Sequence, residues 1–591
     1  MSARRALRGL LAAPLAVLLA CSHAAPASAP AASGKVASGD WIARSNQNAQ
    51  VLLDVQARFA PEFAARTGVS GIDDRISDFT PGRRARQRQA MREAVAVLED
   101  RQKSERDANV AEDLAVLVDA GKRQIEGSEL QEKLQVSYVH VPRLIFTSVH
   151  ALLDPQIAAE RRPAALARVR KYAGLEARYQ PVVQLVEAET REGLQKGLLP
   201  PSRIEVENDL QTSQFLIDGI DKLFAEYKIP GAEQPVATLH RQLEDYAKFV
   251  RAEVLPKARE DFRLPRELYE FQLRQVGVDI SGEELAQRAH RGFEQIQGEM
   301  QKVAARIAQA RGLPSSDYRD VIQALKKDQI PDDQVLAFYK HRLSELEQII
   351  REHRLVTLPA RPARIRLGTP AENAQQPAPH MVPPRLIGNT GEQGEFVLPL
   401  AMPGKVELKY DDFNFDAAAW TLTAHEARPG HELQFASMVE RGVSTARAVF
   451  AFNSVNAEGW GLYSEAIALP YMPDDGKLIS LQLRLQRAAR AFLDPELQMG
   501  KWTPETARQY LMKEVGLSQA FATQEVDRYT FRAPAQATAY YYGYLKILEL
   551  RSAAEKQLGS RFDPLTFHDT ILAQGLLPPD LLRKAVLTQL Q

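Results

Sequence analysis

The sequence contains a single cysteine, so it can form neither an intrachain disulfide nor a cysteine-rich metal site. It also lacks an excess of charge of either sign, because 75 Lys and Arg side chains balance 75 Asp and Glu side chains. Without a basic field we expect no nucleic-acid partner. Long apolar runs are scarce, and the mean hydropathy of -0.31 argues against a polytopic membrane protein. Any metal site must therefore use histidine and carboxylate ligands.

The composition that remains is typical of a soluble globular protein. Hydrophobic residues make up 45% of the 591 residues and charged residues 25%, which argues against extensive disorder. A chain of this length can bury a large core around a deep site.

The N-terminus has the features of a secretion signal. Arg4, Arg5 and Arg8 precede an apolar run over residues 10–20, which is too short to span a bilayer as a permanent helix. The run ends in Leu-Leu-Ala followed by Cys21, which resembles the lipobox of bacterial lipoproteins. In such proteins the chain is cleaved before the cysteine, and lipid is attached to that residue.

This resemblance predicts a signal peptide at 1–20, lipidation of Cys21 and a flexible tether at 21–38, rich in Ala, Pro, Ser and Gly. The alternative is a plain secretory signal with an incidental cysteine. We expect a lipoprotein of the bacterial cell envelope that faces the periplasm and contacts the membrane only through its N-terminal lipid.

From about residue 39 to 591 the dominant pattern is helical, which predicts a mainly α protein. Apolar residues recur every three or four positions in two clear stripes. The first follows a possible capping box at Ser281 and Glu284. The stripes are Leu285, Ala289, Phe293, Ile296, Met300, Val303 and Ile307, and then Val335, Tyr339, Leu343, Leu346 and Ile350.

Residues 355–405 interrupt the helices with many prolines and read as an insertion. Residues 395–400 form a short extended segment within it. Pro399 cannot donate to a ladder, which predicts an edge strand. Such an edge could pair with a bound peptide backbone, or it could belong to a surface hairpin without a function.

The strongest local motif places His425 and His431 on either side of Glu-Ala-Arg-Pro-Gly. In the zincin motif H-E-x-x-H, two histidines one turn apart bind zinc and the glutamate acts as base. Here the second histidine follows six positions after the first, so a regular helix would leave the rings about 120° apart. Pro429 and Gly430 give a reason for a break that could bring His431 round. Glu432 is the rival ligand.

A second segment contains carboxylates with suitable spacing. Glu458 follows His431 by 27 residues, and in glutamate-type zincins a third ligand comes from a second helix downstream. Glu465 lies seven residues further, on the same helix face, where it could support a ligand. Solvated glutamates on an amphipathic helix are the alternative, but neighbouring Trp460 and Ile467 favour a buried site.

These motifs resemble the bacterial domain of unknown function 885 family from near residue 40 to the C-terminus. The family pattern H-E-A-x-P-G-H-x-x-Q is matched by His425, Glu426, Ala427, Pro429, Gly430, His431 and Gln434. E-G-W-x-x-Y-x-E is matched by Glu458, Gly459, Trp460, Tyr463 and Glu465. Later matches are Pro534, Gln536, Ala537, Tyr540 and Gly543, then Leu550, Arg551, Phe567, His568, Leu572 and Gly575. Glu432 stands where many members have a second histidine.

The resemblance implies a multi-helix metallopeptidase fold with a deep cleft, similar to glutamate-type zincins that cut short peptides. Carried onto this chain, it implies zinc held by His425, His431 and Glu458, with the fourth position left for water. Glu426 would take the proton of that water.

Donors for the oxyanion are expected at Tyr540 and His568, because phenol and imidazole can each donate a hydrogen bond. Both could equally be packing residues. Glu465 and Gln434 are expected to support the site, and Arg551 either binds a substrate carboxylate or holds a glutamate.

The leading prediction is a lipid-anchored zinc metallopeptidase acting on short peptides. The alternative is a non-catalytic lipoprotein that binds peptides or envelope components on a degenerate metallopeptidase scaffold. A metal-dependent hydrolase of another amide or ester is a third possibility. Exo- or endo-cleavage, the membrane that receives the lipid and the oligomeric state are left open.

Overall fold

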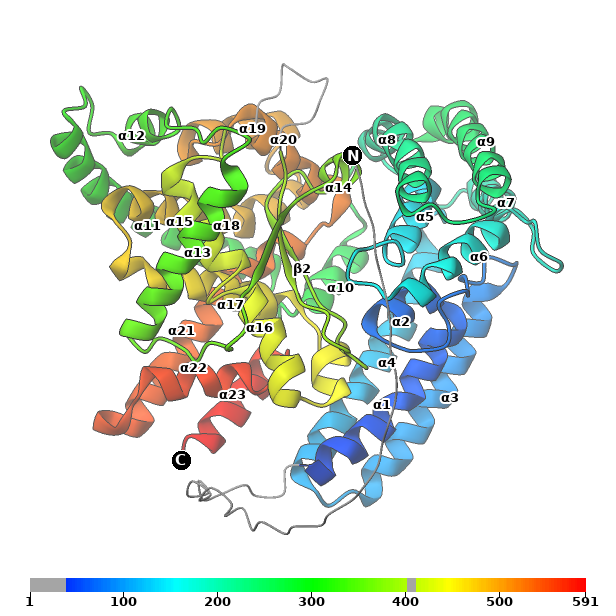
Figure 1. Cartoon of the computed structure of the whole chain (residues 1–591), viewed down its shortest axis with the longest axis horizontal. Coiled ribbons are helices and arrows are strands. Elements are labelled where there is room, and N and C mark those ends of the chain that lie inside the picture. The colour runs from blue at the N-terminus through cyan, green and yellow to red at the C-terminus, as the bar shows by residue number, and fades with distance from the viewer. Residues whose placement is uncertain (1–38, 401–410) are drawn as a thin grey trace, which may run out of the picture. The chain divides into compact units, whose positions relative to one another are not determined.

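The structure, a computed structural model, describes residues 39–400 and 411–591 (Figure 1). Helices dominate these residues, which confirms the prediction of a mainly α protein with a small β segment. The predicted signal peptide at 1–20, the tether at 21–38 and the lipidation site Cys21 lie outside the described residues. Within the described part of the chain, no helix combines the length and apolar character needed to cross a bilayer.

Eight of the first ten α-helices pack in two main groups. Helices α1, α3 and α4 share a hydrophobic cluster with C-terminal residues, whereas α5, α6, α7, α8 and α9 form a cluster of their own. Their bounds are α1 Gly39–Phe59, α2 Pro61–Thr67, α3 Arg83–Ser104, α4 Ala108–Leu134, α5 Val141–His150, α6 Pro163–Tyr172, α7 Val182–Gln195, α8 Arg203–Tyr227, α9 Glu233–Phe249 and α10 Arg266–Val276.

The two predicted apolar stripes form the buried faces of long helices. Helix α11 runs over Gly282–Arg311 and α13 over Val335–Glu352, with α12 at Tyr318–Leu325 between them. All members of both stripes are buried. Ser281 caps α11, since its side chain accepts a hydrogen bond from the backbone N–H of Glu284. The period of three and four therefore located these helices correctly.

The proline-rich insertion forms a three-stranded sheet. Its elements are β1 Arg364–Leu367, α14 Pro370–Gln375, β2 His380–Val382 and β3 Glu395–Leu398. The prediction that residues 395–400 form an edge strand is wrong, because β3 is the middle strand, parallel to β1 and antiparallel to β2. Pro399 follows the last paired residue, so it never has to donate to the ladder.

The sheet lies near the helix that carries the first histidine of the motif. Phe396 and Leu398 of β3 share a hydrophobic cluster with Ala417, which lies on that helix. Residues 395–397 of β3 pair with β1 on one side and with β2 on the other, so these residues have no free edge for a peptide to pair with. The deep cleft implied by the family resemblance stays a prediction.

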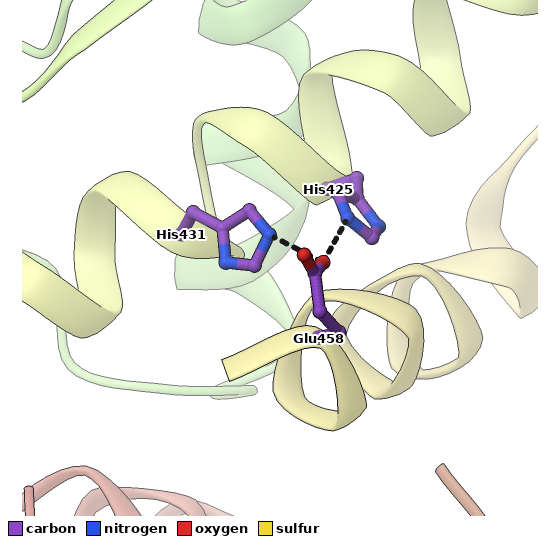
Figure 2. A group of neighbouring side chains, drawn as sticks. All are labelled: His425, His431 and Glu458. Carbon is purple, nitrogen blue, oxygen red and sulfur yellow. Dashed lines mark ion pairs between the residues drawn. The ribbon is translucent and has the colours of Figure 1, made fainter. Parts of the chain in front are cut away.

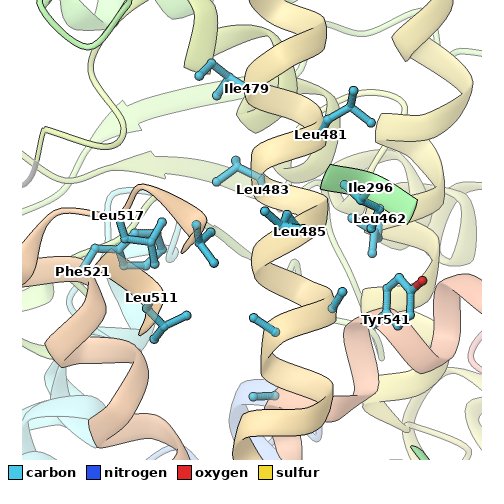
Figure 3. Close-up of a cluster of buried hydrophobic side chains, with 14 of the residues drawn as sticks. Ile296, Leu462, Ile479, Leu481, Leu483, Leu485, Leu511, Leu517, Phe521 and Tyr541 are labelled. Carbon is cyan, nitrogen blue, oxygen red and sulfur yellow. The ribbon is translucent and has the colours of Figure 1, made fainter. Parts of the chain in front are cut away.

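The C-terminal half surrounds one buried helix. Its helices are α15 Asp416–Glu426, α16 His431–Ser437, α17 Ser454–Ala468, α18 Asp474–Gln498, α19 Pro504–Tyr510, α20 Gln519–Asp527, α21 Ala539–Leu558, α22 Pro564–Leu572 and α23 Pro579–Gln589. Helix α18 contacts α11, α15 and α21, and nearly all of its side chains are buried. Figure 3 shows apolar residues leaving α18 on opposite sides, toward Leu511, Leu517 and Phe521 on one side and Ile296, Leu462 and Tyr541 on the other.

Helices α17 and α21 approach each other so closely that their backbones touch. A Cβ atom on Gly459 would lie 2.6 Å from the backbone carbon of Gly543. A Cβ atom on Gly543 would lie 2.0 Å from the backbone oxygen of Val455. Only glycine fits at these two positions, and the contact fixes α17 against α21.

Candidate metal centre

The two histidines of the motif lie on separate helices joined by a sharp break. Helix α15 ends at Glu426 and α16 begins at His431. Residue 430 must be glycine, because a Cβ atom there would lie 1.8 Å from the backbone oxygen of His425. The indole N–H of Trp460, on α17, donates to the backbone oxygen of Pro429 at 3.0 Å and ties the break to the next helix. The predicted disruption at Pro429 is therefore present.

The break brings three potential metal ligands together. Nε2 of His431 lies 3.3 Å and Nε2 of His425 lies 3.7 Å from Oε2 of Glu458. Ligand atoms of all three residues lie within 4.8 Å of one another. Figure 2 shows both imidazole rings, from α15 and α16, turned toward the Glu458 carboxylate on α17. The ring planes of the two histidines are perpendicular, with centroids 4.7 Å apart.

The donor set fits a zinc ion. Two imidazoles and one carboxylate are a ligand combination of catalytic zinc sites, which keep the fourth position open. Ligand atoms bonded at zinc distances in a tetrahedron are about 3.3–3.4 Å apart, close to the two separations between a histidine nitrogen and the Glu458 carboxylate. Only small side-chain movements would therefore separate this arrangement from a coordinated one.

Glu465 and Thr421 fix the orientation of the first imidazole. Oε1 of Glu465 lies 2.7 Å from Nδ1 of His425, and Oε2 accepts a 2.6 Å hydrogen bond from the Thr421 hydroxyl. Both Glu465 and Thr421 are fully buried. With Nδ1 bonded to this carboxylate, Nε2 is the nitrogen that faces Glu458 and is free to coordinate. The structure thus places Glu465 directly behind the candidate ligand.

The charges of this cluster depend on one another. Burial disfavours a charged ring, but the carboxylates of Glu458 and Glu465 outweigh it and raise the pKa of His425 to about 9 in the absence of metal. Burial also disfavours the Glu458 carboxylate, yet the two histidines hold its pKa well below the usual value. A cation entering the site would therefore replace a proton on His425.

Glu426 and Gln434 flank the two histidines. Glu426 is half-buried, and among the described residues it forms no hydrogen bond or ion pair. Its carboxylate is thus available for proton transfer. Gln434 is buried and donates to Oδ1 of Asn456 at 3.0 Å, which holds α16 against α17 two residues before Glu458.

The rival ligand Glu432 lies in a separate ion-pair network. Its Oε1 accepts from Nη1 of Arg361 at 2.8 Å, and its Oε2 accepts from Nε of Arg428 at 2.8 Å. Arg428 is fully buried and also donates to Glu347 and to the backbone oxygen of Arg361. Glu432 therefore stabilises the break between α15 and α16. Of the two rival ligands, His431 is the one that lies with His425 and Glu458.

Tyr540 lies beside the ligand group. Its ring is nearly parallel to that of His425, with centroids 6.3 Å apart. Its hydroxyl accepts a 2.9 Å hydrogen bond from Nη2 of Arg528. Burial raises the pKa of Tyr540, so its phenol keeps its proton at neutral pH. Gln536 connects Arg528 to the ligand Glu458. Its Oε1 accepts a hydrogen bond from Arg528, and its Nε2 lies 3.4 Å from Oε1 of Glu458.

In the described part of the chain, His568 and Arg551 both contact Tyr463 rather than the candidate ligands. Nε2 of His568 lies 2.9 Å from the hydroxyl of Tyr463, and Nδ1 lies 2.6 Å from the backbone oxygen of Leu355. Arg551 donates to the same Tyr463 hydroxyl at 3.0 Å and to Glu555. Burial lowers the pKa of His568 to about 4, so the ring is neutral. Among the described residues, neither side chain contacts the three candidate ligands.

The sequence interpretation missed a group of arginines around Tyr540. Arg487, Arg490 and Arg528 place their guanidinium carbons 5.8, 4.4 and 5.1 Å from the centre of the Tyr540 ring. The first two lie on α18 and are buried. A regular spacing of three positions relates Arg484, Arg487 and Arg490, but this pattern is also typical of a solvated helix face.

Comparison with known proteins gives a family and a fold. One family model, described as "Bacterial protein of unknown function (DUF885)", matches residues 61–586. No protein with a curated description matches the chain. A "putative lipoprotein from Colwellia psychrerythraea" is 19% identical, with a TM-score of 0.76 over 92% of this chain and 99% of that one. A "putative lipoprotein of unknown function from Shewanella oneidensis" is also 19% identical, with a TM-score of 0.68 over 93% and 100%.

Proposed function

The chain belongs to the DUF885 family of bacterial proteins of unknown function, and we propose that it is a zinc-dependent peptidase that cleaves short peptides. The observation that carries this proposal is the convergence of His425, His431 and Glu458 from three helices. Glu465 supports the proposal, because a carboxylate bonded to a ligating imidazole is typical of zinc sites. Such a carboxylate contributes roughly 10- to 100-fold to metal affinity or activity.

In this proposal each residue has a distinct role. His425, His431 and Glu458 would hold the zinc, which would polarise a substrate carbonyl and lower the pKa of water to about 7. Glu426 takes a proton from the attacking water and passes it to the leaving amine. Its free, half-buried carboxylate beside His425 suits this task. General acid–base catalysis of this kind contributes roughly 100- to 10,000-fold to a rate.

Tyr540 donates a hydrogen bond to the developing oxyanion. Its phenol is protonated, and Arg528 holds the hydroxyl oxygen from the other side. The near-parallel ring of His425 keeps Tyr540 adjacent to the ligand group. We assign His568 a structural role through Tyr463 rather than a step in the reaction, because both of its ring nitrogens already have partners.

We also propose that the protein is a lipoprotein of the bacterial cell envelope, with lipid attached at Cys21. The cysteine follows an apolar run after three arginines, and both solved relatives named above are called putative lipoproteins. Mass spectrometry of the N-terminus of protein extracted from membranes tests this. Diacylglycerol on Cys21 is expected, and release of C21S into the soluble envelope fraction would agree with it.

The enzymatic proposal is tested with the full chain and the Glu426→Gln variant. We expect about one zinc per chain in both proteins, and chelator-sensitive cleavage of a panel of unlabelled short peptides by the parent only. Glu270→Gln, on the exposed surface of α10, is the matched control and should cleave like the parent. A parent protein that binds no transition metal, or an E426Q variant as active as the parent, would contradict the proposal.

A further inference from the structure

The arginines around Tyr540 carry more positive charge than the neighbouring side chains neutralise. Arg490 is paired, because its Nε and Nη2 donate to the two oxygens of Glu525. Arg528 is different. It donates to the neutral acceptors Gln536 and Tyr540, and among the described residues it forms no ion pair with a carboxylate.

Arg487 is also incompletely compensated. Its closest carboxylate is Glu465 at 4.0 Å, and that group is already bonded to His425 and Thr421. Nη1 of Arg487 donates only to neutral groups, Leu483 O and Gln486 Oε1, and its buried Nε has no hydrogen-bond partner among the described residues.

One turn earlier, Arg484 repeats this pattern. Its Nε and Nη2 are buried without a hydrogen-bond partner in the described part of the chain, and its guanidinium lies over the ring of Tyr544. Burying a guanidinium without a counter-charge is unfavourable, because the charge loses its hydration. Such a cost is tolerated where an incoming anion supplies the missing charge.

The positive charge of Arg528 lies close to the candidate metal centre. The guanidinium of Arg528 is separated from Glu458 by a single side-chain amide, that of Gln536. Arg528 is half-buried, whereas Arg487 and Arg490, which lie around the same tyrosine ring, are buried. An extended peptide advances about 3.3–3.6 Å per residue, so this position suits a group one or two residues from a bond at the metal centre.

We propose that Arg528, with the positive charge of Arg487 near the same tyrosine ring, forms a subsite for a carboxylate of the substrate. This inference rests on the proposed peptidase function, since the subsite is defined relative to the bond cut at the metal centre. A planar guanidinium with free N–H groups binds a carboxylate well. The carboxylate comes either from the C-terminus of a short peptide or from an acidic side chain near the cleaved bond. In the first case the enzyme removes residues from C-terminal ends.

The experiment measures binding without requiring turnover. The full-length E426Q protein, loaded with zinc, is titrated by calorimetry with an N-acetylated tetra-alanine peptide as the free acid and as the C-terminal amide. A third set consists of the amide with glutamate at each position in turn. We expect the free acid to bind roughly 10- to 100-fold more tightly than the amide. Adding Arg528→Gln should bring this ratio close to one, and Arg528→Lys should retain part of it.

Arg274→Gln, which removes an exposed guanidinium paired with Glu126, is the matched control and should keep the full ratio. A preference for glutamate-containing amides that is lost in R528Q would keep the subsite and assign the carboxylate to a side chain. Equal binding of all peptides, no binding of any, or an unchanged ratio in R528Q would overturn the inference. Failure of the parent to cleave peptides would contradict the proposed function, while the binding ratio still decides the subsite.

Discussion

The backbone of Gly461 lies directly against the imidazole of His425. A Cβ atom on residue 461 would come within 2.8 Å of His425 Nε2, the nitrogen that faces Glu458. The same atom would lie 3.0 Å from Cε1 of His431. The second glycine of the E-G-W-x-x-Y-x-E region, one residue after Trp460, thus provides the space in which the two rings converge.

Replacing Gly461 by alanine should therefore weaken metal binding. The added methyl group would overlap both imidazoles and displace one or both of them, and its bulk would oppose the convergence of the rings that zinc distances require. We expect zinc content after dialysis against a weak chelator to fall well below that of the parent. Gly298→Ala is the control, because this exposed helical glycine has open space around it, and the change should leave zinc unaffected. Equal zinc retention in both variants would contradict the prediction.

Replacing Glu465 by glutamine should lower zinc affinity without removing a ligand. The variant loses the negative charge behind His425 Nδ1 and weakens the preference for the coordinating orientation. We expect a roughly 10- to 100-fold higher dissociation constant in a chelator competition assay. Glu395→Gln removes another buried carboxylate, in the sheet, and should change stability but not this constant. If both variants lose zinc equally, the effect is one of general destabilisation.

The Tyr540→Phe variant tests the proposed oxyanion donor. Removing one such donor costs about 100- to 1,000-fold in kcat, and zinc content should stay at the parent level. Tyr541→Phe removes the neighbouring hydroxyl, which forms no hydrogen bond among the described residues, and should leave kcat unchanged. A Y540F variant that changes only KM would indicate a role in substrate binding.

The buried ring of His568 should make the protein less stable in acid. Burial lowers its pKa to about 4, whereas the ring titrates near 6.5 in the unfolded chain. The unfolded state binds the proton first, so the free energy of unfolding falls as the pH decreases from about 6.5 to 4, by roughly 3 kcal/mol. Above pH 6.5 this contribution is fully present.

Thermal unfolding of the parent and of His568→Gln measures this effect. The variant loses the bonds to Tyr463 and Leu355, so we expect a lower Tm at pH 7.5 and a smaller difference at pH 4.5. His341→Gln alters an exposed ring and should show neither effect. A difference in Tm that is constant between the two pH values would contradict the assigned pKa.

The sequence predicted the parts of the site that depend on local chain geometry. The stripe from Leu285 to Ile307 located α11, and Pro429 with Gly430 indicated a break between the two histidines. Both inferences use only spacing and the backbone preferences of single residues. The error at β3 came from the same kind of argument. Pro399 excludes a central strand only if it lies inside the strand, but β3 ends at Leu398, one residue before the proline.

The arginine cluster could not be predicted because it depends on which faces of α18 are covered. Arg484, Arg487 and Arg490 have the spacing of an exposed helix face, and charged residues usually remain in water. Tertiary packing reverses this expectation, since α11, α15 and α21 surround the helix. Glu525 and Arg528 come from a segment more than thirty residues further along, and no local pattern relates them to α18.

The crossing of α17 and α21 has a consequence for inhibitor design. Glu458 precedes Gly459 on one helix, and Tyr540 lies three residues before Gly543 on the other, so the glycine contact sets a constant spacing between the two ends of the site. Neither helix can slide without its backbone colliding with the other. A compound that joins a metal-chelating group to a hydrogen-bond acceptor for the Tyr540 hydroxyl should therefore have one optimal linker length, and rigid linkers should outperform flexible ones.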